Sequence, residues 1–186
     1  VEAVASQVFI PLTVGGGVSK LQDIERLLEK GADKVSINTS AILDPSLVGN
    51  AAKKFGSQCI VVAVDSKREG EKSYVYTHGG KNKTAFETSA WIKIVEGEGA
   101  GEILLTSMDR DGTKIGFDNE LTSSIAKDLS IPLITSGGAG CIDHMIEGIT
   151  DGKADAVLAA SIFHQKEITI AEVKDGLASK GIEVRL

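Results

Sequence analysis

Short apolar runs alternate along this sequence with longer segments that have the periodicity of amphipathic helices. The runs 60–64 and 103–105 are apolar without interruption, which is typical of parallel strands that are covered on both faces. The sequence therefore predicts an α/β fold with a parallel sheet. The expected strand and helix of each of the six units are 9–14 and 20–30, 34–38 and 45–55, 59–65 and 86–95, 102–107 and 119–129, 132–136 and 142–150, and 156–160 and 169–179.

Parallel strand–helix units of this kind usually close into a barrel of eight strands. Six units therefore indicate a (β/α)8 TIM-barrel type fold with about six of the eight units, and we expect residues 1–186 to form a single barrel domain that is truncated at its N-terminus. Segment 1–7 has the pattern of the tail of a helix. Segment 71–78 alternates polar and apolar residues before Gly79 and Gly80, which predicts a small exposed hairpin inserted into one strand–helix connection.

The composition indicates which kind of protein this is and which kinds of ligand it can bind. The chain is 42% apolar and 25% charged, as in one globular domain, and its net charge of −6 argues against a nucleic-acid or anionic-membrane surface. Small anions held by backbone dipoles remain possible. Cys59 and Cys141 form no CxxC motif and have no histidine at metal-ligand spacing, so we expect a reducing compartment, no disulfide and no metal. No run approaches the roughly 18 apolar residues of a membrane span, and a cytoplasmic location is expected.

A strand, a glycine-rich turn, a helix and a second strand occur twice. The turns are Thr13-Val-Gly-Gly-Gly17 and Ser136-Gly-Gly-Ala-Gly140, and Asp33 follows the first turn at the spacing at which Asp155 follows the second. Glycine lets backbone N–H groups approach a ligand, and the next helix directs its partial positive charge there, so phosphate is the ligand expected. The alternative is that the glycines only make the turns. Two phosphate sites on one rim would suit a substrate with a phosphate at each end.

Asp65 ends the apolar run 60–64. A carboxylate is costly inside such a strand but tolerable at the C-terminal mouth of a barrel, where catalytic groups lie. Asp65 is therefore a candidate general acid or base. The alternative is a helix cap or an ion pair with Lys67 or Arg68.

A second acidic tip follows the strand 102–107. Asp111 and Gly112 would be an ordinary turn by themselves, but among neighbouring hydroxyl groups they can offer a base together with phosphate-facing N–H donors. Two of the three histidines, His78 and His144, are expected on the surface. His164 is expected near the rim of the last strand, in a packing or capping role.

Five segments of the sequence, taken together, carry a resemblance to a known family; they are 13–17, 31–39, 61–65, 106–113 and 136–140. They closely resemble the cyclase subunit of imidazole glycerol phosphate synthase, which acts in histidine biosynthesis. The resemblance implies a (β/α)8 barrel that converts a bisphosphorylated ribulosyl aminoimidazole carboxamide intermediate and ammonia into imidazole glycerol phosphate and AICAR. It also implies a glutaminase partner that supplies the ammonia, and no metal or organic cofactor.

The same resemblance implies roles for individual residues. Asp65 matches the catalytic aspartate of strand 5, a general acid, whereas the aspartate of strand 1 has no counterpart in the sequence. Asp111 matches an acidic position beside the ring chemistry. Lys34 and Glu102 resemble part of a charged ring at the ammonia entrance, although solvated strand starts would look the same. The implied phosphate contacts are Gly17, Asn38 and Thr39 at one site, and Gly112, Gly138, Ala160 and Ser161 at the other.

Two other functions stay open at this stage. The isomerase of the preceding step in the same pathway resembles the chain in fold, in twin phosphate sites and in the strand-5 aspartate, although segments 107–113 and 36–39 fit the cyclase better. A phosphate-binding barrel fragment without turnover is the third reading, because the strand-1 aspartate is missing. Without two front strands the open sheet edges would also favour association between copies of the chain.

Overall fold

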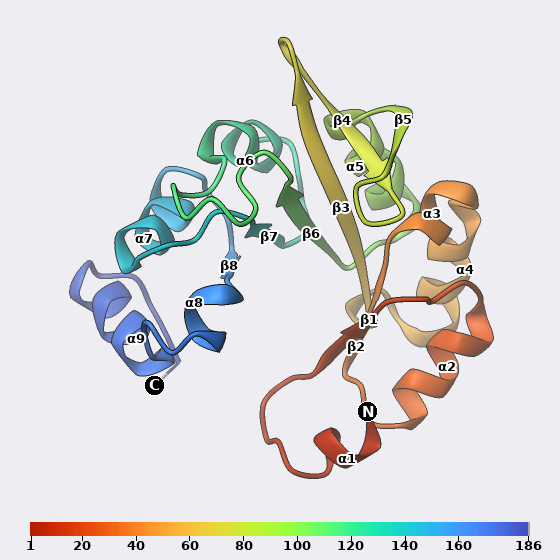
Figure 1. The fold of residues 1–186 in the computed structure, drawn as a ribbon. Coiled ribbons are helices and arrows are strands. Elements are labelled where there is room, and N and C mark those ends of the chain that lie inside the picture. The colour runs from red at the N-terminus through yellow and green to blue at the C-terminus, as the bar shows by residue number, and fades with distance from the viewer. Residues whose placement is uncertain (186) are drawn as a thin grey trace.

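The computed structural model describes residues 1–185 and shows a curved sheet whose parallel strands form a half-barrel, with helices on its outer face (Figure 1). Each neighbouring pair along the main path of the sheet is parallel. The prediction of an α/β fold with part of a (β/α)8 barrel is confirmed. The path runs β1 (Thr13–Gly15), β2 (Lys34–Ile37), β3 (Ile60–Glu69), β6 (Glu102–Ser107), β7 (Leu133–Ser136) and β8 (Ala156–Leu158).

Helices connect successive strands of this path and cover the convex face of the sheet (Figure 1). None of the helices in the part of the chain that the structure describes is both long and apolar enough to cross a membrane. The long helices are α2 (Leu21–Glu29), α4 (Ser46–Phe55), α5 (Thr88–Glu98), α6 (Asn119–Ala126), α7 (Ile142–Thr150) and α9 (Ile170–Ser179). The short ones are α1 (Glu2–Ala5), α3 (Thr39–Leu43), η1 (Ser57–Cys59) and α8 (Ser161–His164).

The main hydrophobic core lies between the sheet and these helices. Alternate residues of β2 and β6, such as Val35 and Ile103, are fully buried against helix residues such as Ile24 and Trp91. The intervening residues of the same strands face the concave side of the sheet and are only partly buried. Side chains on the concave side are therefore available to a ligand. A second, smaller core, with Phe117, Met145, Ile162, Val173 and Leu177 among its members, packs near the C-terminal end.

The predicted strand 9–14 is wrong at its start. Phe9 and Ile10 are 96% and 68% exposed and lie outside β1, which begins at Thr13. Pro11 lacks the N–H that a strand needs for pairing, which separates these two residues from the sheet.

The predicted hairpin is larger and less exposed than expected. β4 (Lys72–Thr77) pairs antiparallel with the extended end of β3 and with β5 (Asn82–Glu87), and one face of β4 is buried. The three strands rise above the half-barrel in Figure 1. Because Phe86 belongs to β5, helix α5 begins at Thr88 and not at residue 86 as predicted. The Phe86 ring instead packs on Trp91, with 5.0 Å between ring centroids.

Candidate active site

Asp65 lies on the concave face of the sheet, near the C-terminal ends of the parallel strands. It is level with Thr106 of β6, which is in turn level with Ser136 of β7. Asp65 follows Ala63 on the same face of β3, and both line a cavity of about 770 Å³. The structure therefore places Asp65 at the edge of the sheet where catalytic groups of such barrels are found.

The first glycine turn and the tip of β2 line the same cavity as Asp65. Its lining includes Gly17, Asn38 and Thr39, the three residues expected at one phosphate site. The side-chain amide of Asn38 donates a hydrogen bond to Asp65 Oδ2 at 3.0 Å. The other polar atom of that amide, Asn38 Oδ1, is buried and has no hydrogen-bond partner among the described residues.

The second glycine turn lines a smaller cavity of about 130 Å³. Leu158 of β8 lines both cavities, so the two adjoin on one rim of the half-barrel. The structure thus brings together the residues expected at the second phosphate site and the second candidate carboxylate. These residues are Asp111, Gly112, Gly138, Ala160 and Ser161.

The environment of Asp65 opposes its ionisation. Burial raises the pKa of the Asp65 carboxyl, the hydrogen bond from Asn38 lowers it, and the negative charge of Asp111 raises it again. The net effect is a pKa above the ordinary value. A larger fraction of Asp65 therefore holds its proton at a given pH, which suits a proton donor.

The two halves of the sequence repeat have similar backbone geometry. Gly16 and Gly17 have φ of 96° and 70°, and Gly137 and Gly138 have φ of 92° and 102°. The second strand of each half leads into a short helix that the sequence analysis missed, α3 after β2 and α8 after β8. The residues before these helices, Asn38 and Ala160, share an unusual conformation, because φ of −126° and −121° is combined with negative ψ of −96° and −67°. Phosphate sites of such barrels often use the N-terminus of a short extra helix.

The glycines of the two turns are needed for different reasons. A Cβ on Gly16 or Gly17 would meet nothing within 4 Å. A Cβ on Gly137 would lie 2.6 Å from the carbonyl oxygen of Ser107, and one on Gly138 would lie 2.2 Å from that of Gly116. The first turn is therefore open toward the cavity at Gly16 and Gly17, whereas the second is covered by the loop between β6 and α6.

The matched aspartates of the repeat lie at the other end of the strands and have a structural role. Asp33 Oδ2 accepts the N–H of Leu12 at 2.7 Å, and Asp155 Oδ2 accepts the N–H of Leu133 at 2.9 Å. Each carboxylate thus satisfies a backbone donor at the start of the preceding strand, and neither lines the two cavities. Part of the sequence repeat therefore reflects folding and not ligand binding.

His78 is exposed, as expected, whereas His144 is partly buried, which corrects its surface assignment. His78, in the turn between β4 and β5, lines the same cavity as Asp65, and its backbone N–H donates to Thr39 Oγ1 at 3.0 Å. His144 accepts the N–H of Gly140 on Nδ1 at 3.1 Å, so it supports the second glycine turn. His164, for which a packing or capping role was expected, is instead the exposed last residue of α8. The folded hairpin brings His78 to the site, and no local sequence signal indicates this.

Lys34 and Glu102 lie at the N-terminal ends of β2 and β6, and their side chains form an ion pair. Glu102 precedes Leu104 on the same face of β6, and Leu104 lines the cavity that holds Asp65. The pair is therefore on the concave face, at the end opposite to Asp65. The structure therefore contradicts the alternative, in which Lys34 and Glu102 would be separate and fully solvated.

A comparison with known protein families identifies the relatives of this chain. Residues 1–169 match the family model described as histidine biosynthesis protein. The matched segment contains all the strands of the half-barrel and both cavities. Members of this family are barrel enzymes of the histidine pathway, and they include both the isomerase and the cyclase. The chain belongs to the histidine biosynthesis protein family.

Proposed function

We propose that this chain is of the cyclase type. In this proposal it converts a bisphosphorylated ribulosyl aminoimidazole carboxamide intermediate and ammonia into imidazole glycerol phosphate and AICAR, with Asp65 as general acid. The observation that carries the proposal is the position of Asp65 on a rim where two adjoining cavities are each lined by a glycine turn and a short-helix N-terminus.

The two cavities suit the two ends of one substrate. Backbone N–H groups at glycine turns and helix starts favour phosphate oxygens, and each cavity has both features. Gly17 and Thr39 would hold one phosphate, and Gly138 and Ser161 the other. The middle of the substrate would then lie across the rim beside Asp65.

The two carboxylates have environments that suit different tasks. The raised pKa of Asp65, caused first by burial, favours the protonated form that a general acid needs. Asp111 is exposed and lines the second cavity, so its carboxylate can face the reacting ring as an acceptor. Groups whose environments differ in this way commonly divide acid and base roles. Asn38 would hold the Asp65 carboxyl in place through its 3.0 Å hydrogen bond.

The isomerase of the same pathway is the second candidate, because it belongs to the same family and would use the same pair of phosphate sites. The loop after β6 favours the cyclase. Its segment 107–113 resembles the cyclase in sequence, and it places a second carboxylate close enough to raise the pKa of Asp65.

We also propose that a glutaminase subunit supplies the ammonia from the far end of the strands. The support is the Lys34–Glu102 ion pair at the N-terminal end of the concave face. A charged pair there is suited to contact a polar molecule that enters from the end opposite to the proposed reaction site.

An enzyme assay distinguishes the candidates. The purified chain is mixed with the bisphosphorylated intermediate and an ammonium salt, and AICAR release is followed; isomerisation is measured in parallel. We expect AICAR to form, and Asp65→Asn to slow its formation by about 100- to 10,000-fold. Asp175→Asn is the matched control, because Asp175 is exposed on α9, away from both cavities.

The other outcomes each contradict the proposal. Isomerised product without AICAR would assign the chain to the isomerase. Binding of the bisphosphate with no product, unchanged in Asp65→Asn, would indicate a binding protein without turnover.

A further inference from the structure

The loop between β6 and α6, residues 108–118, carries Asp111 and Gly112 to the second cavity. One side of the loop is attached to β3 and the other to the second glycine turn. The Met108 N–H donates to the carbonyl of Ser66 on β3 at 2.8 Å, and the Gly116 N–H donates to the carbonyl of Gly138 at 2.8 Å. The position of the loop therefore depends on the part of β3 that continues beyond Asp65.

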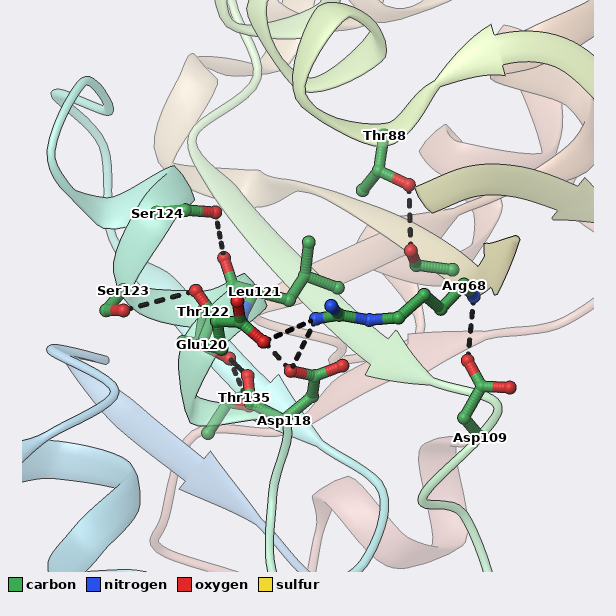
Figure 2. Close-up of polar contacts among 11 residues, drawn as sticks. Arg68, Thr88, Asp109, Asp118, Glu120, Leu121, Thr122, Ser123, Ser124 and Thr135 are labelled. Carbon is green, nitrogen blue, oxygen red and sulfur yellow. Dashed lines mark hydrogen bonds and ion pairs between the residues drawn. The ribbon is translucent and has the colours of Figure 1, made fainter. Parts of the chain in front are cut away.

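Arg68 on that extension holds both ends of the loop. Its backbone N–H donates to Asp109 Oδ2 at 2.7 Å, near the start of the loop. Its guanidinium Nη2 lies 3.5 Å from Asp118 Oδ1 and 3.1 Å from Glu120 Oε2, at the end of the loop and the start of α6 (Figure 2). One residue thus spans the gap between the two ends of the loop.

Asp118 is fixed by more than Arg68. Its side chain caps α6 by accepting the N–H of Leu121 at 3.1 Å, and its carbonyl accepts the hydroxyl of Thr122 at 2.8 Å (Figure 2). The Asp118 side chain is 10% exposed, whereas that of Glu120 is 82% exposed. The contact with Asp118 is therefore the one of the two that is shielded from water and that connects Arg68 to a rigid helix start.

The two aspartates of the acidic tip face different surroundings. Asp109 and Arg68 line a separate cavity on the side of the loop next to Gly70 and Glu147. Asp111 lines the candidate phosphate cavity with Gly138 and Ser161. Asp109 therefore belongs to the attachment of the loop, and Asp111 to the site.

We propose that Arg68 is a positioning residue. Its guanidinium holds the end of the loop 108–118 through Asp118 and so keeps Asp111 and Gly112 at the site. The bond from its backbone N–H to Asp109 does not depend on the side chain and is retained when residue 68 is substituted. The effect on turnover rests on the proposed function, whereas the attachment of the loop does not. A displacement of about 1 Å at catalytic groups can reduce a rate by about 100-fold, so a loose loop is enough to impair the reaction.

The test compares Arg68→Ala, Arg68→Lys and Asp118→Asn. Asparagine keeps the helix cap and removes only the charge. We expect Arg68→Ala to lower kcat for AICAR formation by about 10- to 100-fold and to weaken inorganic phosphate binding at the second cavity. We expect Arg68→Lys to retain most of the wild-type kcat. We expect the double variant Asp118→Asn, Arg68→Ala to have a kcat no lower than that of Arg68→Ala alone. Lys54→Ala is the control, because it breaks an exposed ion pair, with Glu25, far from the loop in the chain.

Hydrogen exchange of the backbone amides in 108–118 tests the attachment without any turnover. Faster exchange in Arg68→Ala, with the wild-type rate in α9, would support the proposal even if the wild-type chain makes no AICAR and the proposed function fails. Wild-type exchange in the loop together with wild-type kcat and phosphate affinity in Arg68→Ala would overturn it. An equal loss of kcat in Arg68→Lys and Arg68→Ala would also overturn the proposal.

Discussion

At the scale of single residues, the chemistry of the site depends on how burial and two side chains act on the Asp65 carboxyl. Burial and the charge of Asp111 raise the pKa of its carboxyl, and Asn38 lowers it through a hydrogen bond. Asp65 lies within β3, Asp111 in the loop after β6 and Asn38 at the tip of β2. A substitution at Asn38 or Asp111 should therefore change the pKa of Asp65 while Asp65 itself stays in place.

We expect Asp111→Asn to lower the pKa of Asp65, because it removes a nearby negative charge. An activity that needs protonated Asp65 is lost as the pH rises through that pKa, so the loss should occur at lower pH in the variant. Asn38→Ala should raise the pKa of Asp65, because the substitution removes the hydrogen bond that stabilises the carboxylate. The loss of activity should then occur at higher pH. Carbon-13 NMR titration of the Asp65 carboxyl measures both shifts.

His78 is the other titratable side chain that lines the cavity with Asp65. Repeating the Asp65 titration in His78→Gln shows how much His78 contributes to the measured midpoint. Asp175→Asn is the control for the loss of a distant charge. An unchanged midpoint in Asp111→Asn would show that the two carboxylates do not interact.

At the scale of elements, the two glycine turns use the same backbone conformation in different surroundings. The first turn leads from β1 to α2 and is open, whereas the second leads from β7 to α7 and supports the loop 108–118. Two similar sequence motifs therefore have different surroundings: the first turn is free to contact a ligand, whereas the second also packs against a loop.

We expect alanine substitutions in the two turns to have different costs. Gly17→Ala should reduce the free energy of unfolding by about 1 kcal/mol, because only the positive φ is unfavourable. Gly138→Ala should cost about 3 kcal/mol, because its Cβ would also meet the backbone of Gly116. Urea unfolding measures both. Equal losses would contradict this account of the turns.

At the scale of the whole molecule, the half-barrel has two unpaired edges among the described residues. β1 pairs only with β2, and β8 pairs only with β7. Backbone N–H and C=O groups on such edges favour pairing with another strand. The exposed side chains of Phe9 and Ile10 lie just before β1 and add apolar surface near one edge.

We expect the 186-residue chain to associate with copies of itself through these edges. Light scattering coupled to size-exclusion chromatography should show a mass that rises with concentration. Phe9→Ser combined with Ile10→Ser should weaken the association, because it removes apolar surface near β1. Ile170→Ser is the control, since Ile170 is 61% exposed but lies on α9. A monodisperse monomer at every concentration would contradict the prediction.

The order of elements could be predicted because its signals are local. Uninterrupted apolar runs and helical periodicity identified strand 102–107 and helix 142–150 with the bounds that the structure has, and the end of an apolar strand marked Asp65. The start of β1 was missed because the apolar side chains of Phe9 and Ile10 do not reveal whether a partner strand lies beside them.

The sequence by itself thus determined the α/β class, the partial barrel, the two glycine turns and the acidic residue after the apolar run 60–64, because each depends on neighbours along the chain. The strand β3 continues past Asp65 to Glu69, which the sequence analysis did not predict. Only the tertiary structure decided that His78 reaches the site, that Asp109 and Asp111 separate, and that Arg68 joins both ends of a loop. These contacts join residues that are distant in the chain. They depend on how the hairpin and the loops pack on the curved sheet, which no local pattern encodes.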